Sequence, residues 1–363
     1  MKRFFAFTLI FALLLGLCAC GGDPAETTKA TADSKPVVDS NAGSKSAQGK
    51  DNQSNQATRE RPKENGFQDG VLRVYSLKGP TSMGIATMLR DSEDGKTNNR
   101  YVSNVCTTAD EVTAALVNGE ADAALLPANA AAALFNKAGG FSVVAVNTLG
   151  VLYVVENGDT IHSVKDLEGK TVYLTGKGTT PEYALRYLLA ANGIEDKVTL
   201  EFKSEAQEVV TAMGENLAAI GLLPQPFVTA AAMQNEQLRI ALDLTAEWKD
   251  VSKGGSLVTG VTVVRNEIIE KNPDMVSGFV KDCLLGVDNV NRDPAAAAEL
   301  IVNMGIVAKA PIAEKAIPYC NLVCITGGEM KTLLSGYLKT LYDQNPKAVG
   351  EKMPADEFYY TGE

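Results

Sequence analysis

The sequence predicts an α/β fold made of two sheet-containing lobes and a helical C-terminal part. Three observations carry this prediction. Short apolar segments alternate with amphipathic ones from about residue 69, the alternation restarts near Thr171, and a helix–strand unit of the first half recurs in the second. Short apolar strands separated by helices are typical of a parallel sheet that helices cover on both faces. The stretch 69–363 is long enough to build two hydrophobic cores.

The first lobe opens with an apolar strand that a Gly-Pro pair ends, after which Thr81 or Ser82 caps a helix. Pro127 ends the third strand in the same way and precedes an alanine-rich helix. The predicted strands of this lobe span 71–77, 101–106, 123–126, 142–147 and 151–156, and its predicted helices span 81–90, 109–118 and 128–137.

The second lobe repeats this alternation. Its predicted strands span 171–175, 198–203, 218–223 and 238–244, and its predicted helices span 180–192, 205–213 and 225–235. The stretch 256–264 is apolar and β-branched, and beyond it the pattern is helical to about residue 345. Pro273, Pro294 and Pro311 each lie where a new helix can begin, which is a favoured place for proline.

The repeated unit consists of a helix, a Gly-Glu turn, a buried strand and a proline that precedes a new helix. Its copies lie at 111–127 and 208–224, and the second has two extra residues between the Gly-Glu pair and the proline. Ligands of open α/β sheets bind outside the carboxyl ends of strands, where helix N-termini offer free N–H groups. Two similar lobes therefore direct such strand ends toward one place.

Four junctions between a strand and a helix are the candidate ligand-binding segments: 78–83, 127–129, 176–181 and 224–226. Their residues are small, polar or proline, so their backbones can approach a ligand closely. Each junction taken alone also fits an ordinary helix cap, and 176–182 lacks the residue order of a phosphate-binding P-loop. The candidate ligand-binding residues are Gly79, Pro80, Thr81, Ser82, Pro127, Asn129, Gly178, Thr179, Thr180 and Gln225.

Composition excludes several function classes. The formal net charge is −10 without a basic cluster, so we expect no nucleic-acid partner. His162 is the single histidine and precedes a surface turn, so no Ser–His–acid set and no metal site can be assembled around it. We therefore expect no catalytic residue, no metal and no cofactor. The folded part has four cysteines, which are either buried thiols or partners in a disulfide: Cys106, Cys283, Cys320 and Cys324.

Other side chains bear on the ligand. Lys78 and Lys177 are the basic residues at the junctions, and no arginine lies there. Four aromatic residues either stack on a flat ring or pack in the core: Tyr153, Tyr183, Phe227 and Trp248. The carboxylates of Glu120, Asp122 and Glu215 lie in turns, where we expect them to be solvated.

The first twenty residues predict export and lipidation. Lys2 and Arg3 precede an apolar run at 4–17, which is too short to span a bilayer and has the layout of a signal peptide. The ending Leu17-Cys18-Ala19-Cys20 resembles the lipobox of bacterial lipoproteins, in which the cysteine is acylated and becomes the new N-terminus. We therefore expect a signal peptide at 1–19, lipidation at Cys20, and a polar, disordered tether over 20–68.

The folded part resembles the type II solute-binding proteins of ABC importers, in the branch that binds thiamine-precursor pyrimidines, alkanesulfonates, taurine and nitrate. The matching motifs cover about 71–360: Gly-Glu-Ala-Asp-Ala-Ala at 119–124, Ser-Val-Lys-Asp-Leu-Glu-Gly-Lys-Thr-Val at 163–172, Gly-Thr-Thr-Pro at 178–181, and Leu-Leu-Pro-Gln-Pro at 222–226. The resemblance implies the two-lobed periplasmic-binding-protein type II fold. Lobe I would comprise 69–153 plus 258–363, lobe II would comprise 154–257, and crossover strands would lie near 152–155 and 257–264.

The same resemblance implies a function. The protein would capture a small solute between its lobes and deliver it to an ABC permease with its ATPase, while a lipid anchor alone holds it at the extracytoplasmic face of the cell membrane. We expect no enzyme activity, although an enzyme of the same fold is an alternative. Because the junctions offer hydroxyls and amides but no arginine, a small, flat, weakly charged organic solute is favoured. A sulfonate- or nitrate-type anion held by helix N-termini is the other possibility.

Overall fold

The computed structural model describes residues 70–216, 218–252 and 255–362. The chain divides into two units, 1–63 and 64–363, and all described residues belong to the second. The expected signal peptide, the lipidation site at Cys20 and the tether over 20–68 lie outside the described residues.

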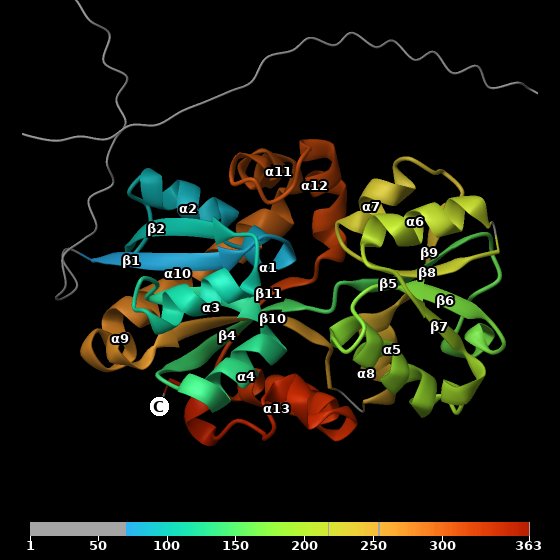
Figure 1. Cartoon of the computed structure of the whole chain (residues 1–363). Helices are drawn as coiled ribbons and strands as arrows, with labels where there is room; N and C mark the ends of the chain where they lie inside the picture. Colours follow the sequence, from blue (N-terminus) through green and yellow to red (C-terminus); the bar gives the residue numbers. More distant parts are fainter. Residues whose placement is uncertain (1–69, 217, 253–254, 363) are drawn as a thin grey trace, which may run out of the picture. The chain divides into compact units, whose positions relative to one another are not determined.

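The described strands form two mixed sheets that helices cover (Figure 1). The six-stranded sheet has the order β11-β4-β10-β3-β1-β2. Its strands are β1 (Val71–Leu77), β2 (Arg100–Cys106), β3 (Ala123–Pro127), β4 (Phe141–Leu149), β10 (Val258–Arg265) and β11 (Leu322–Ile325). β1 runs parallel to β2 and β3, whereas β10 is antiparallel to β3 and β4, and β11 is antiparallel to β4.

The five-stranded sheet has the order β7-β6-β8-β5-β9. Its strands are β5 (Leu152–Asn157), β6 (Thr171–Leu174), β7 (Thr199–Phe202), β8 (Ile220–Pro224) and β9 (Leu238–Asp243). β6 is parallel to β7 and β8, and β5 is antiparallel to β8 and β9. The α/β fold class is therefore confirmed, but each sheet is only partly parallel. The antiparallel strands β5 and β10 are the ones that the chain enters on passing from one half to the other, β5 directly after β4 and β10 after the helix α8.

The helices mostly follow the predicted pattern, with three differences. The helix α8 (Leu244–Val251) lies where the sequence predicted no helix. The expected helix at 81–90 is two short helices, α1 (Pro80–Met83) and α2 (Ala86–Glu93). The C-terminal part is not continuously helical, because the four-residue strand β11 joins the edge of the six-stranded sheet. The remaining α-helices are α3 (Ala109–Val117), α4 (Ala128–Ala138), α5 (Thr180–Ala191), α6 (Ala206–Glu215), α7 (Phe227–Ala232), α9 (Asn266–Lys271), α10 (Pro273–Arg292), α11 (Pro294–Asn303), α12 (Ala310–Ala316) and α13 (Gly327–Gln344). Within the described part of the chain, none of the helices combines the length and apolarity needed to cross a membrane.

The central strands of each sheet are buried on both faces. In β3, Leu126 packs into a cluster with residues of α3 and α13, while Leu125 packs into another with residues of α2 and α10. In the five-stranded sheet, Leu222 lies in the cluster that contains residues of α5 and α8, and Leu223 lies in the cluster that contains residues of α6 and α7. Successive residues of a strand point to opposite faces, so a strand buried on both faces reads as a continuous apolar run.

The chain passes between the two sheets twice. It leaves the six-stranded sheet after Leu149 and enters β5 at Leu152, and it returns between α8 and β10. The two crossings pack against each other at Gly150. A Cβ atom added there would overlap Thr245 Oγ1 and would lie 2.7 Å from Leu257 Cδ2. Only glycine, which lacks this atom, fits where the crossings meet.

Candidate functional site

The register of the sheets places the predicted junctions beside the crossings. At the end of β3, Pro127 pairs with Gly260, which lies near the start of β10. At the end of β8, Pro224 pairs with Leu152, the first residue of β5. β1 and β6 run parallel to β3 and β8, so their carboxyl ends lie at the same edges. The crossing edge of each sheet therefore carries the candidate segments.

The junction after β1 holds two buried hydroxyl groups. Thr81 is 5% exposed and Ser82 is fully buried. Both donate a hydrogen bond to the Leu77 carbonyl oxygen, Thr81 Oγ1 at 3.2 Å and Ser82 Oγ at 2.5 Å. Gly79 precedes α1 with φ 136°, a region that favours glycine, and Pro80 is the first residue of the helix. The protons of both hydroxyls are thus committed, while their oxygens keep acceptor capacity.

A buried polar cluster adjoins α1, and the sequence analysis missed it. Asn147 Nδ2 donates to Thr262 Oγ1 at 3.1 Å, and Asn147 Oδ1 accepts from Thr148 Oγ1 at 2.9 Å. A Cβ atom at Gly260 would overlap both Asn147 and Thr81, so this cluster reaches α1. These residues lie inside strands that read as apolar. The signals in the sequence were Gly260, which lies within a β-branched run, and the pair Asn147-Thr148 near the end of a strand.

The junction after β3 is simpler. Pro127 precedes α4 as its N-cap, with extended backbone angles, and Asn129 lies in the first turn of that helix. Both residues are half-buried. The helix begins directly after the strand, so this junction contains no loop.

The junction after β6 bonds mainly to itself. The Gly178 N–H donates to Glu182 Oε2 at 2.7 Å, and Thr179 Oγ1 donates to the Gly176 carbonyl oxygen at 2.6 Å. Thr180 Oγ1 lies 3.4 Å from the hydroxyl of Tyr337 on α13. Because α13 packs on β4 and β10 of the six-stranded sheet, this last contact joins the two halves of the described chain.

The junction after β8 contains an unpaired donor. Gln225 is 2% exposed, and its backbone N–H donates to the Val151 carbonyl oxygen in the crossing at 2.9 Å. Its side-chain Oε1 accepts from Thr229 N at 3.3 Å and from Thr229 Oγ1 at 2.8 Å. The Thr229 backbone N–H can only donate, so the end of the Gln225 side-chain amide that faces it must be the oxygen. Within the described residues, Gln225 Nε2 then has no hydrogen-bond partner.

Comparison with known proteins identifies the family. A family model described as NMT1/THI5 like matches residues 107–297, which is more than half of the chain. The chain belongs to the NMT1/THI5-like family. No match was found among curated proteins.

Solved structures share the fold of this NMT1/THI5-like protein. One is an ABC transporter structure from Parabacteroides distasonis, with 24% identity, a TM-score of 0.68, and coverage of 80% of this chain and 99% of that one. Another is the periplasmic aliphatic sulphonate binding protein SsuA from Escherichia coli, with 16% identity, a TM-score of 0.62, and coverage of 78% and 91%. A third is the desulfurization enzyme DSZB, with 12% identity, a TM-score of 0.52, and coverage of 80% and 96%.

Three of the four candidate aromatic residues of this NMT1/THI5-like protein belong to its core. Tyr153, Tyr183 and Trp248 are 2%, 8% and 1% exposed. Phe227, at the start of α7, is 47% exposed. Tyr319 is 46% exposed, and its carbonyl oxygen accepts from the Tyr153 hydroxyl at 2.7 Å, which links β5 to the segment that precedes β11. No sequence signal pointed to Tyr319, because its short 3₁₀ turn (Ile317–Tyr319) lies far along the chain from every junction.

One expectation about the carboxylates is wrong. Asp122 is not solvated but 2% exposed. Arg73 donates to its Oδ2 from the backbone N at 2.9 Å and from Nε at 2.8 Å, and Arg73 Nη2 binds its other oxygen. The side-chain hydrogen bonding to Asp122 raises the pKa of Arg73, although burial of the guanidinium acts in the opposite direction. Parallel pairing of β1 with β3 brings Arg73 beside the turn, which sequence spacing does not reveal. Glu120 and Glu215 are exposed as expected.

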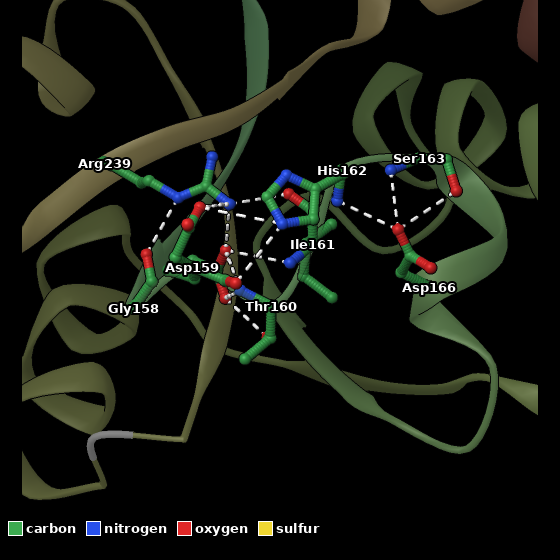
Figure 2. A network of polar contacts seen from close by, with 9 residues as sticks. Gly158, Asp159, Thr160, Ile161, His162, Ser163, Asp166 and Arg239 are labelled. Carbon is green, nitrogen blue, oxygen red and sulfur yellow. Dashed lines mark hydrogen bonds and ion pairs between the residues drawn. The ribbon is translucent and has the colours of Figure 1, made fainter.

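His162 lies in an exposed loop that has a structural network of its own (Figure 2). Arg239 donates to Glu156 Oε1 at 2.6 Å and to the Gly158 carbonyl oxygen at 2.8 Å. Asp166 accepts from the backbone N–H of His162 at 2.9 Å. Across the described residues there is no group of three or more potential metal-ligating side chains.

The cysteines of the described part are free thiols. Burial raises the pKa of Cys320 to about 12 and that of Cys324 to about 11, which holds both thiols neutral. Two surface hollows are lined by none of the candidate ligand-binding residues, one of about 490 Å³ beside Arg265 and one of about 290 Å³ beside Lys203.

Proposed function

We propose that this protein is an extracytoplasmic solute-binding lipoprotein of an ABC importer. It captures a small organic solute between lobe I, comprising 69–153 plus 258–363, and lobe II, comprising 154–257. It then delivers the solute to a membrane permease that an ATPase drives. The names of similar structures support this class of function, since they include an ABC transporter protein and a sulphonate-binding protein.

The observation that carries the proposal is the unpaired amide of Gln225. A buried donor without a partner costs about 1–3 kcal/mol. Gln225 Nε2 lies in this condition beside the crossing, at the crossing edge of the five-stranded sheet. An acceptor group of a bound solute would satisfy it. The ten junction residues assigned to binding in the sequence analysis are proposed to surround that solute.

The two crossings supply the motion that capture requires. Two short connections resist little bending, so the lobes can close on a solute as hinged bodies. In the described arrangement, Thr180 of lobe II contacts Tyr337 of lobe I, with 3.4 Å between their hydroxyl oxygens.

The protein acts by binding and not by catalysis. The fold itself also occurs in the desulfurization enzyme DSZB, so the fold does not decide this point. The chain's own side chains support binding: His162 is exposed in its loop, and Cys320 and Cys324 are held as neutral thiols.

The Gln225 proposal has a direct test. Thermal shift and calorimetry across pyrimidines, amino acids, sulfonates and nitrate identify a binding solute, which at 100 times its Kd stabilises the fold by about 2.7 kcal/mol. The variant Gln225→Glu keeps an oxygen for Thr229 but replaces the N–H donor with a second oxygen. We expect its affinity for that solute to fall at least about tenfold.

The control is Gln207→Glu, which makes the same chemical change at an exposed position of α6. It should bind with native affinity. Unchanged affinity in Gln225→Glu would move the solute away from this amide, and a panel without any binder would contradict the proposed function itself.

The lipid anchor is proposed at Cys20 and is tested separately. The acyl chains added there attach the protein to the outer membrane face through one residue, and more than one chain is needed for stable attachment. Cys20→Ser should leave the membrane fraction or remain unprocessed, with unchanged solute affinity. A processed Cys20→Ser protein that stays membrane-bound would disprove lipidation at this position.

A further inference from the structure

The first turn of α5 carries its own negative charge. Glu182 is the third residue of this helix and is 9% exposed. Its Oε2 accepts from the Gly178 N–H at 2.7 Å, and its Oε1 accepts from Arg186 Nε at 2.8 Å. The carboxylate therefore reaches back across the junction that follows β6.

This carboxylate is ionised at neutral pH. Burial alone would raise the pKa of Glu182, but the hydrogen bonds from Gly178 and Arg186 outweigh burial and hold the pKa below its ordinary value. The N-terminus of a helix carries the equivalent of about half a positive elementary charge, which favours a negative group beside it. At the N-terminus of α5, the carboxylate of Glu182 already supplies this negative group.

Several other donors near the junctions after β6 and β1 are also bonded within the chain. The Thr179 N–H donates to the Gly176 carbonyl oxygen at 3.0 Å, as the Thr179 hydroxyl does at 2.6 Å. Across the crossing edge, Thr81 and Ser82 both donate to the Leu77 carbonyl oxygen. Anions need donors, whereas the hydroxyls of Thr179, Thr81 and Ser82 have only their acceptor oxygens left to offer a ligand.

We propose that Glu182 is a specificity-determining residue that rejects anionic solutes and so selects an uncharged one. Its carboxylate fills the position at the start of α5 that an anion would otherwise take, and a second negative charge beside it is disfavoured. The inference rests on the proposed function of solute capture. It also separates this chain from the Escherichia coli protein, which is named for aliphatic sulphonates.

The test compares two probes of nearly equal shape, methanesulfonate and the uncharged methanesulfonamide. Glu182→Gln keeps an oxygen that can accept from the Gly178 N–H but removes the charge. The matched control is Glu195→Gln, because Glu195 Oε1 also faces Arg186, at 3.9 Å, and does not bond to the junction. Calorimetry gives the Kd of both probes for the wild type and both variants, and melting curves verify that each variant is folded.

We expect methanesulfonate to bind Glu182→Gln about tenfold more tightly than it binds the wild type or Glu195→Gln. Equal methanesulfonate binding by all three proteins, including no binding by any, would overturn the proposal. The wild-type comparison does not depend on how the variants fold: a wild type that binds methanesulfonate as tightly as methanesulfonamide also overturns it. In both cases a neutral solute found in the wider panel would leave the proposed function standing.

Discussion

The two copies of the internal repeat share their arrangement of helix and strand but differ in the polar groups at and after the strand. In the first copy α3 leads into β3, and in the second α6 leads into β8. Each strand lies between a parallel and an antiparallel neighbour, β1 and β10 in one sheet and β6 and β5 in the other. Each strand also ends in a proline at the crossing edge, as Pro127 and Pro224.

The copies differ in how their polar groups are satisfied. The first carries Asp122, whose buried carboxylate is bound by Arg73, and α4 starts directly after Pro127. The second continues from Pro224 into Gln225 and Pro226 before α7 begins. The Gln225 amide has no partner for its Nε2 among the described residues. The polar group of the first copy is thus satisfied by an internal ion pair, while the second copy contains a buried amide nitrogen that has no partner among the described residues.

Removing the ion pair of the first copy should have the largest effect. Asp122→Ala leaves the Arg73 donors without their carboxylate, and breaking a buried pair by removing one partner costs about 3 kcal/mol where the remaining charge can partly reach water. Arg73 can do so, since its side chain is 37% exposed. Urea denaturation measures the loss. Glu120→Gln, in the same turn, should change stability by less than about 0.5 kcal/mol, and equal losses in both variants would contradict the burial of Asp122.

A change where the two crossings meet should have an intermediate effect. Gly150→Ala inserts a methyl group where Thr245 and Leu257 leave no room, and such overpacking costs about 1–3 kcal/mol. Because it forces the crossings apart, we also expect weaker solute binding. Denaturation and calorimetry measure the two effects. Gly214→Ala is the control, since an added Cβ meets nothing within 4 Å there. Wild-type stability and solute affinity in Gly150→Ala would show that the crossings accommodate the methyl group, which would contradict the prediction.

The smallest effect concerns acid stability of the sheet that holds the second copy. Glu156 on β5 is 4% exposed, and although burial opposes it, hydrogen bonds from Thr160 and Ile161 and the charge of Arg239 lower its pKa from 4.5. A lowered folded-state pKa gives stability that is present above the unfolded value and is lost as the pH falls through the folded value. Glu156→Gln should therefore lose about 1 kcal/mol at pH 7 and show a shallower decline of stability below pH 4.5 than the wild type. Denaturation at several pH values measures both, and parallel pH curves would exclude Glu156 as the cause.

The sequence by itself determined the α/β class, the order of most elements and the repeat. These features are local. The apolar run at 123–126 reads as a buried strand that Pro127 ends, and Pro224 ends the corresponding strand of the second copy, whatever the tertiary structure around them. It also determined where the junctions lie, because strand ends and helix starts follow from neighbouring residues. The family resemblance rested on the same local motifs and is confirmed by the family model.

Only the tertiary structure decided which strands pair and which polar groups are satisfied. β11 is four residues long, and its partner β4 lies far away in sequence, so no local pattern distinguishes it from the helices around it. Asp122 is buried because parallel pairing brings Arg73 to it, and Asn147 is polar inside a strand because Thr148 and Thr262 satisfy it. Hydrophobic periodicity reports which face of a segment is covered. Hydrogen-bond satisfaction depends on groups brought together from distant parts of the chain, which is why the unpaired amide of Gln225 is visible only in the folded protein.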